Sequence, residues 1–274
     1  MYAAKLLAAA LLAMFAWVGA ANAQLKSGDN PEGSEVWQKV KASLFQGRTI
    51  GAAGDVIALE APARAEDAAI VPIAIKTRHP QTPSNYIDKV YLIIDNNPSP
   101  ISAIFQFTQD SGRADIETRV RVDEYTHVRA IAETNDGKLY MTTKFVKASG
   151  GCSAPPGKDQ QAALASMGKM KFRVEGDVAL NKPVLAQLMI SHPNNSGLAM
   201  DQYTRQFTPA HFVRKIDVSY AGRPVLSADL DFSISENPNL RFYFVPRGDG
   251  ELKAEVVDSK DLRFDSAVKV TKTD

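Results

Sequence analysis

The sequence predicts an all-β protein made of two β-sandwich domains preceded by one short helix. Three observations lead to this prediction. Apolar and polar residues alternate in short runs from Ile57 onward, and Pro, Asn, Asp and Gly bound these runs. The strand pattern lapses for long only between Ala148 and Ser166. The 274 residues are enough for two ordinary domains, each with its own core.

The predicted helix covers residues 34–45. Ser34 can cap its first turn, because a serine side chain accepts hydrogen bonds from the free N–H groups there. The apolar residues at helical spacing on one face are Val36, Trp37, Val40 and Leu44. We expect this face to pack on the first domain.

Strands are predicted in both halves of the chain. In the first half they cover residues 69–75, 90–95, 101–107, 114–122, 126–133 and 138–147. In the second half they cover residues 170–175, 184–190, 213–220, 223–230, 239–246, 250–257 and 262–271. Asn135-Asp136-Gly137 is typical of a hairpin turn between two of them. Regular short strands with turns between them are the pattern of β-sandwiches.

The first 23 residues have the features of a cleavable signal peptide. Lys5 supplies a positive charge, residues 6–18 form an apolar run, and Ala21-Asn22-Ala23 is a small-residue cleavage site. The alternative is a retained N-terminal anchor, although the apolar run is short for a membrane span. We therefore expect a periplasmic protein secreted through a cleavable signal peptide.

Charge and motifs argue against several classes of function. The chain has 32 basic and 31 acidic side chains, and removal of Lys5 with the signal peptide makes the two numbers equal. Nucleic-acid binding is not expected, since no basic stripe is present. The sequence has neither a glycine-rich phosphate loop between a strand and a helix nor a nucleophile elbow. We expect no cofactor.

No metal site is expected either. The chain has one cysteine and no histidine pair at zinc spacing. A soft copper site is the alternative, because several methionines lie near one histidine. These residues are Met167, Met170, Met189, Met200 and His192. Methionine more often fills protein cores than it binds a metal.

The single cysteine, Cys152, is the main functional signal. Gly150 and Gly151 precede it, and Pro155 and Pro156 follow it. Glycines widen the accessible backbone angles and prolines exclude a helix or a central strand, so we expect a mobile, exposed segment. An unpaired cysteine in an oxidising compartment suggests a reactive thiol or an intermolecular bridge. The alternative is a buried, inert cysteine.

A catalytic thiol would need a base. His79, His127, His192 and His211 are the only histidines, and any of them could approach Cys152 in the fold. A histidine at a strand end is more often a hydrogen-bonded structural residue than a general base. We expect a protein that is not an enzyme.

Several motifs of the second half resemble SoxZ. These motifs are ISHP at 190–193, SGL at 196–198, PAHFVR at 209–214, GRPVLSAD at 222–229 and SENP at 235–238. The first half resembles SoxY in its helix, its strand order and Gly150-Gly151-Cys152. The whole chain therefore resembles a fused SoxYZ protein, the sulfur carrier of thiosulfate oxidation, and more closely the SoxYZ-like carriers associated with quinoprotein dehydrogenases.

The resemblance implies immunoglobulin-like sandwiches and a role for the cysteine. In that family the cysteine of a Gly-Gly-Cys-Gly-Gly tail carries the sulfur substrate covalently to separate enzymes. By resemblance, Cys152 is the covalent carrier and Gly150 and Gly151 form its hinge. Residues 34–147 would then be the SoxY-like sandwich with its helix, and residues 167–274 the SoxZ-like sandwich. Residues 148–166 would be the flexible linker that bears the carrier cysteine.

This sequence departs from the family pattern in two ways. Ser153-Ala154-Pro155 replaces the two glycines after the cysteine, and the carrier segment lies in mid-chain rather than at a free end. A segment anchored at both ends enters an enzyme channel only as a hairpin. The identity of the cargo is therefore left open.

Two functions from different classes follow. The first is a periplasmic carrier that presents a sulfur-containing intermediate on Cys152 to partner redox enzymes, either Sox-type enzymes or a quinoprotein dehydrogenase and its cytochrome. The second is a non-covalent accessory module of such a dehydrogenase, in which the cysteine is incidental. An exposed Cys152 would also allow a disulfide-linked homodimer.

Overall fold

The computed structural model describes residues 30–155, 160–201 and 204–273, and the predicted signal peptide lies outside these residues. The first half contains β1 (Ile50–Ala52), β2 (Ile57–Glu60), β3 (Val71–Thr77), β4 (Ile87–Ile94), β5 (Ile101–Phe107), β6 (Ile116–Val120), β7 (Thr126–Thr134) and β8 (Leu139–Val146). The second half contains β9 (Met170–Glu175), β10 (Val184–Ile190), β11 (Val213–Tyr220), β12 (Arg223–Leu230), β13 (Asn239–Phe244), β14 (Gly250–Asp258) and β15 (Arg263–Val270). The all-β prediction is confirmed.

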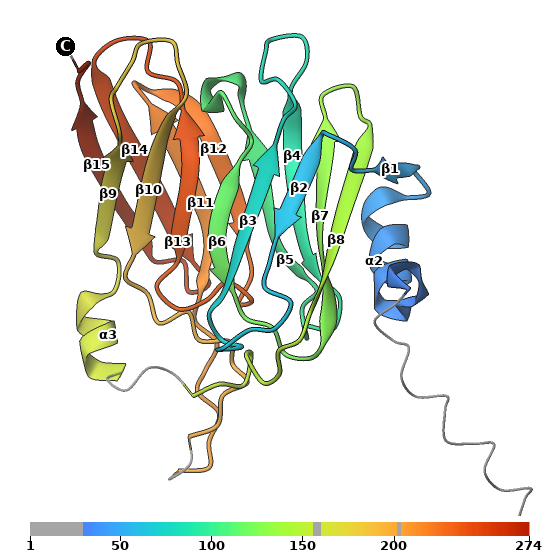
Figure 1. Ribbon diagram of the computed structural model, residues 1–274. Coiled ribbons are helices and arrows are strands. Elements are labelled where there is room, and N and C mark those ends of the chain that lie inside the picture. The colour runs from blue at the N-terminus through green and yellow to red at the C-terminus, as the bar shows by residue number, and fades with distance from the viewer. Residues whose placement is uncertain (1–29, 156–159, 202–203, 274) are drawn as a thin grey trace, which may run out of the picture.

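The strands form two sheets that pack face to face (Figure 1). The larger sheet has nine strands in the order β1-β8-β7-β4-β5-β12-β11-β14-β15. The smaller sheet has six strands in the order β2-β3-β6-β13-β10-β9. Side chains alternate between core and surface along most strands, as in β3 and β10, because successive residues point to opposite faces. Each half therefore contributes strands to both layers of the sandwich.

The two halves are joined edge to edge. In the larger sheet β5 pairs antiparallel with β12, and in the smaller sheet β6 pairs antiparallel with β13. One continuous apolar core runs through both halves, from Ile57 to Val270. The structure thus differs from the expected two separate cores. Pairing satisfies the backbone groups that each half would otherwise expose at a sheet edge.

A buried carboxylate adds to this junction. Asp110 lies in the short 3-10 helix η2 (Gln109–Ser111) of the first half and is 8% exposed. Its side chain accepts hydrogen bonds from Arg223 at 2.7 Å and from Arg247 at 2.9 Å, and both arginines belong to the second half. Ion pairs therefore link the halves, at the end of the sandwich opposite the linker (Figure 1).

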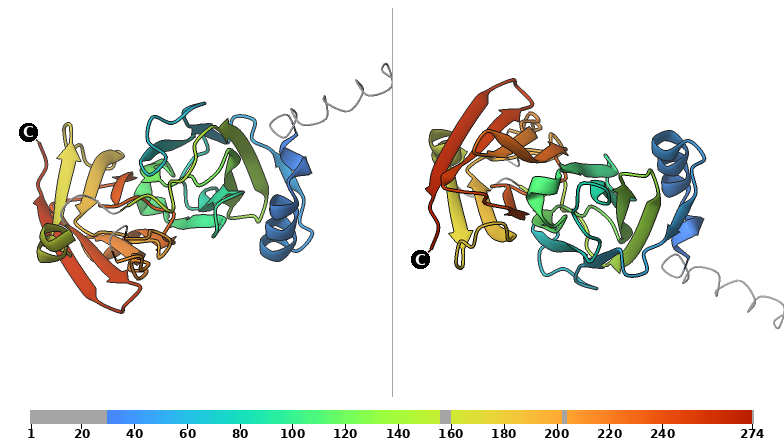
Figure 2. Two further views of the ribbon diagram at one scale, coloured as in Figure 1. Left: turned by 90° about the horizontal axis from the view of Figure 1, so that it is seen from below. Right: turned by 90° about the horizontal axis from the view of Figure 1, so that it is seen from above.

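The predicted N-terminal helix is present as α2 (Glu35–Phe45), preceded by the 3-10 helix η1 (Pro31–Gly33). Ser34 caps it as expected, since its side chain accepts a hydrogen bond from the N–H of Trp37 at 3.1 Å. Trp37 and Phe45 are fully buried against the outer face of the first half. Figure 2 shows α2 on the side of the first half that faces away from the second half.

The main errors of the strand prediction lie at the start of the sheet region. β1 and β2 were not among the expected strands, although the apolar alternation was recognised from Ile57. β1 pairs parallel with the edge of β8, and such a short edge strand carries little periodic signal.

The linker also differs from expectation, because residues Gln160–Ser166 form helix α3. Within the described ranges, none of the helices has the length and apolar character needed to cross a membrane.

Candidate functional site

The segment that carries Cys152 follows the last strand of the first half. Residues 148–155, here called the arm, lie at the lower end of the sandwich in Figure 1, where the chain passes from β8 toward the second half. Backbone hydrogen bonds attach the arm to the chain just after β6. The N–H of Gly150 donates to the carbonyl of Asp123 at 2.8 Å, and the N–H of Gly151 donates to the carbonyl of Val122 at 3.0 Å. The arm is docked in this structure.

Cys152 is bonded on both sides of its backbone. Its N–H donates to Oδ1 of Asp123 at 3.1 Å, and its carbonyl accepts a hydrogen bond from Oγ of Ser196 at 2.5 Å. Asp123 belongs to the first half and Ser196 to the second. Cys152 therefore lies where the two halves meet, and each half supplies one hydrogen bond.

The expectation of an exposed thiol is wrong for this conformation, because Cys152 is 1% exposed and forms no disulfide. The prediction used only the small side chains around the cysteine in the sequence. The groups that cover it come from distant segments, the chain after β6 and the loop after β10. A disulfide-linked homodimer cannot form through Cys152 while the arm is docked.

The two glycines also have a role in docking that was not foreseen. A Cβ atom on Gly151 would lie 2.1 Å from the carbonyl oxygen of Ala68 and 2.6 Å from that of Val122. Only glycine fits such a close approach of two backbones. Gly150 has a φ angle of +78°, in the left-handed region that glycine adopts readily. Gly151 is therefore required for the docked conformation, and Gly150 suits the backbone angle found there.

The surroundings keep the docked thiol neutral. The pKa of Cys152 is raised to about 12, mainly by burial; the carboxylates of Asp123 and Asp231 contribute to this rise, and Arg121 opposes it. A thiol with this pKa is almost entirely protonated near pH 7, whereas the thiolate is the nucleophile. The docked cysteine is therefore a poor nucleophile.

Arg121 is the cation of this site. It is 7% exposed, and its Nη1 donates to the carbonyls of Phe232 at 3.0 Å and Ile234 at 2.6 Å. Burial lowers its pKa, while Cys152 and Glu236 raise it. Among the described residues, no carboxylate forms an ion pair with Arg121. A buried arginine bonded only to neutral acceptors favours any negative charge that comes near it.

The histidines are not arranged as bases for the thiol. His79 forms a hydrogen bond of 2.7 Å with Asn85 on the surface, and the ring of His127 meets that of Phe145 edge to face. In the described part of the chain, the charged groups that act on the sulfur are Asp123, Arg121 and Asp231, and none is an imidazole. The geometry of the docked arm thus gives no support to a thiol enzyme.

His192 and His211 instead meet at Asp258, a cluster that sequence reasoning missed. Nε2 of His211 lies 2.7 Å and Nε2 of His192 lies 3.5 Å from Oδ2 of Asp258, and all three residues are buried. The three residues are far apart in the sequence, so their spacing carries no signal. Only the strand-end positions, after β10, before β11 and at the end of β14, could have suggested that they meet.

This cluster has the atom types of a metal site, but one of its nitrogens, Nε2 of His192, carries a proton. The N–H of Asn194 donates to Nδ1 of His192 at 3.0 Å, so Nδ1 holds a lone pair and the proton of the neutral ring is on Nε2. Burial, together with His211, lowers the pKa of His192 to about 4, so this ring is neutral near pH 7. In this tautomer Nε2 of His192 has no lone pair to offer a metal. The cluster is a hydrogen-bonding centre that fixes the loop carrying Ser196.

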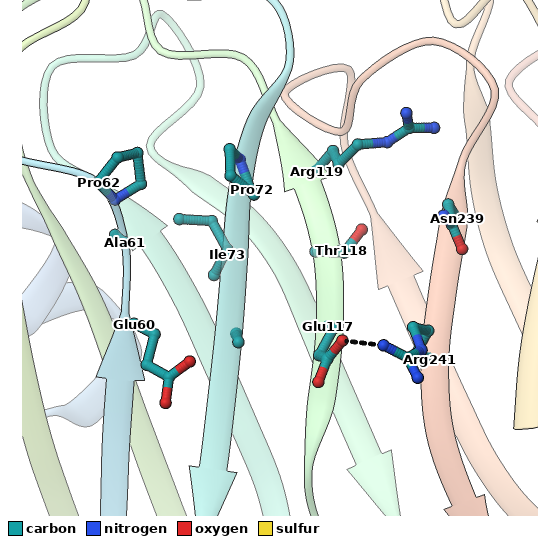
Figure 3. A pocket seen from close by; sticks show the side chains of 11 residues that line it. Glu60, Ala61, Pro62, Pro72, Ile73, Glu117, Thr118, Arg119, Asn239 and Arg241 are labelled. Carbon is teal, nitrogen blue, oxygen red and sulfur yellow. Dashed lines mark hydrogen bonds and ion pairs between the residues drawn. The ribbon is translucent and has the colours of Figure 1, made fainter. Parts of the chain in front are cut away.

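A separate groove of about 460 Å³ lies on the outer face of the smaller sheet, where β6 meets β13 (Figure 3). Arg241 of β13 bonds Glu117 of β6 at 2.9 Å across this junction. Arg119 also lines the groove, and its Nη2 donates to the carbonyl of Asn237 at 3.1 Å. The groove holds equal numbers of acidic and basic side chains, Glu60 and Glu117 against Arg119 and Arg241. This balance favours no charged ligand.

The fold and the site together define an all-β protein whose two sandwich halves enclose a single cysteine at their junction. Residues 41–152 match the family model of the sulfur oxidation protein SoxY, and residues 172–269 match that of the sulphur oxidation protein SoxZ. The chain thus carries a SoxY domain and a SoxZ domain in tandem, consistent with a fused SoxYZ protein. Cys152 is the last residue of the SoxY match.

Three solved structures are similar to parts of the chain. The sulfur carrier protein SoxY from Chlorobium limicola f thiosulfatophilum is 23% identical, covers 41% of this chain and 90% of its own, and has a TM-score of 0.34. The E23A variant of superoxide reductase (neelaredoxin) from Ignicoccus hospitalis is 17% identical, covers 43% of this chain and 90% of its own, and has a TM-score of 0.32. The fibronectin(III)-like modules of Clostridium thermocellum CbhA are 12% identical, cover 80% of this chain and 94% of their own, and have a TM-score of 0.24.

A search of curated proteins finds no match. The match to the SoxY family supports the expectation of a protein that is not an enzyme.

Proposed function

We propose that this protein is a covalent carrier of a sulfur-containing intermediate. Cys152 is the attachment residue, Gly150 and Gly151 are the hinge of the arm, and partner redox enzymes act on the bound group. The observation that carries the proposal is the position of Cys152. It is the only cysteine of the chain and the last residue of the SoxY match, and it lies where the SoxY and SoxZ domains meet.

A carrier needs a second conformation in which the arm is released. The docked arm is held by hydrogen bonds to Val122, Asp123 and Ser196, and its residues belong to no strand. Release therefore leaves both sheets intact. Local opening of this kind costs less free energy than global unfolding. Partner enzymes would meet the thiol in the released state, where it is hydrated and its pKa is closer to that of a free cysteine.

The attachment chemistry is a bond between two sulfur atoms. Joining the thiol of Cys152 to the outer sulfur of a thiosulfate-like anion removes one proton and two electrons, so a redox partner must accept the electrons. An oxidised donor needs no such partner. Tetrathionate and the thiol give a Cys–S–thiosulfate adduct, one thiosulfate ion and one proton.

The site of action is proposed from the N-terminal sequence. A cleavable signal peptide over residues 1–23 supports export to the periplasm. The tandem SoxY and SoxZ domains support Sox-type redox enzymes as partners. A link to a quinoprotein dehydrogenase or its cytochrome rests on the sequence resemblance alone.

Tetrathionate treatment tests the proposal directly. The purified protein is incubated with tetrathionate, and its intact mass is measured without reducing agent. We expect one added thiosulfate group, located on Cys152 by peptide mapping and removed by dithiothreitol. The matched control is Cys152→Ser, which should not gain mass. A thiol that is free after denaturation but never modified in the folded protein would contradict a carrier role.

One observation favours a second function. Cys152 is buried and neutral in the docked arm, as a structural cysteine would be. The protein would then be a non-covalent accessory module for a quinoprotein dehydrogenase or its cytochrome. In that case Cys152→Ser would restore full dehydrogenase activity to a deletion strain. Under the carrier function the same variant would fail to restore it.

A further inference from the structure

We propose that the charge on residue 152 controls the arm, which stays docked while Cys152 is a neutral thiol and is released when its sulfur carries an anionic group. This inference rests on the proposed carrier function. It adds the step by which a loaded sulfur becomes exposed to partner proteins.

The first argument is the tight fit of the docked arm. The carbonyls of Ala68 and Val122 leave no space for even one carbon atom on Gly151. The backbone of Cys152 is held on both sides, because its N–H donates a hydrogen bond to Asp123 and its carbonyl accepts one from Ser196. An arm packed in this way cannot shift to bring a charged sulfur group toward water without losing these bonds.

The second argument is the charge around the sulfur. The carboxylates of Asp123 and Asp231 both disfavour a negative charge on Cys152, and burial disfavours it most. Arg121 favours such a charge, but its Nη1 is committed to the carbonyls of Phe232 and Ile234. One cation therefore faces two anions and the loss of hydration, so the site is built for a neutral group.

Loading changes this charge by one unit. When tetrathionate reacts, the thiol proton and one thiosulfate ion are released to the medium. A thiosulfate group with one negative charge remains bonded to the sulfur of Cys152. A buried charge without sufficient partners costs more free energy than the few hydrogen bonds of the arm contribute. The loaded arm is therefore released, and removal of the cargo allows it to dock again.

Two isosteric substitutions separate charge from size. Cys152→Asp places a negative charge at the site of the sulfur, and Cys152→Asn has the same shape without the charge. Hydrogen exchange is followed at the amides of Gly150, Gly151 and residue 152, which are donors only in the docked arm. We expect exchange to be ~10-fold or more faster in Cys152→Asp than in Cys152→Asn. Equal exchange in the two variants would overturn the proposal.

A second substitution tests the source of the repulsion. Asp123→Asn keeps an oxygen that accepts the hydrogen bond from the N–H of residue 152 but removes the negative charge. Added to Cys152→Asp, it should restore much of the protection of the three amides. Failure to restore any protection would contradict the role of this carboxylate. Amide exchange in β4 and β11 reports whether each variant is folded.

Alkylation gives an independent measurement on the natural cysteine. Iodoacetate adds a charged carboxymethyl group and iodoacetamide adds a neutral group of nearly the same size, and each reaction releases iodide and one proton. We expect faster exchange of the arm in the carboxymethylated protein. Neither the substitutions nor the alkylation use a sulfur-containing cargo, so both tests remain decisive if no cargo binds. A cargo adduct that stays docked would overturn this inference and leave the carrier function standing.

Discussion

The hydroxyl of Ser196 donates a hydrogen bond of 2.5 Å to the carbonyl of Cys152, and this bond joins the arm of the SoxY half to a loop of the SoxZ half. The loop is itself fixed. The side chain of Asn194 bonds the carbonyl of Ile234 at 2.9 Å and accepts from the N–H of Val213 at 2.8 Å. Fusion of the two domains thus brings a rigid partner for the arm into the same chain.

Loss of this hydroxyl should make the thiol more reactive. Ser196→Ala removes one hydrogen bond from the docked arm, which raises the released fraction about three- to tenfold at a net ~1 kcal/mol per bond. The measurement is the rate at which the native protein reacts with a chromogenic disulfide reagent. Ser149→Ala is the matched control, because Ser149 is an exposed residue of the same arm. Equal rates in the wild type and Ser196→Ala would show that this bond does not hold the arm.

Gly151→Ala should release the arm almost completely. Its added methyl group would overlap the carbonyls of Ala68 and Val122, whereas Gly248→Ala meets no atom within 4 Å and serves as control. We expect the thiol of Gly151→Ala to react nearly as fast as a free cysteine while the far-UV spectrum stays unchanged. Slow reaction in Gly151→Ala would mean that the docked arm is not the conformation that protects Cys152.

High pH should weaken the folded state through Cys152. Burial raises the pKa of this thiol to about 12 in the docked arm, above its ordinary value near 9. Between these two values the unfolded chain has lost the proton and the docked chain retains it, so the unfolded state binds fewer protons and stability falls as pH rises. The loss is at most ~1.4 kcal/mol per pH unit.

The comparison with Cys152→Ser isolates this effect. Urea unfolding is measured for both proteins from pH 8 to pH 10.5. The wild type should lose stability relative to Cys152→Ser as pH rises through this range, and below about pH 8 the difference should be constant. A difference that does not change across the whole range would contradict a buried, neutral thiol.

The ion pairs at the opposite end of the junction should contribute to stability. Asp110→Asn removes the charge that faces Arg223 and Arg247, and since Asp110 is buried we expect a loss of about 1–3 kcal/mol in the free energy of unfolding. The control is Asp55→Asn, whose partner Arg78 lies on the surface. Unfolding in urea gives both values. Equal small losses would show that Asp110 does not help to hold the halves together.

Most of the fold could be predicted because its elements carry local signals. The strands at 101–107, 170–175, 184–190, 213–220 and 223–230 were predicted with the bounds that the structure shows. Ser34 was identified as a helix cap from its position before an apolar face. Such patterns reflect burial on one face of an element, and that burial is visible in the sequence.

The docked site could not be predicted because its contacts are long-range. Asp123 and Ser196 lie 29 and 44 positions away from Cys152, and no periodic pattern records their approach. The same holds for His192, His211 and Asp258. The cysteine and its two glycines could be identified from the sequence. The glycines were predicted to make the segment flexible, whereas in the structure Gly151 makes a tight backbone contact.

The most direct test of the carrier function is the mass of residue 152 in the protein as its own cell makes it. The protein is isolated without reducing agent from cells that oxidise sulfur compounds, and its intact mass is compared with that of Cys152→Ser from the same strain. The carrier function requires a sulfur-containing adduct on Cys152 that dithiothreitol removes. A thiol that carries no adduct under every growth condition, in a strain where Cys152→Ser grows as well as the wild type, would contradict it.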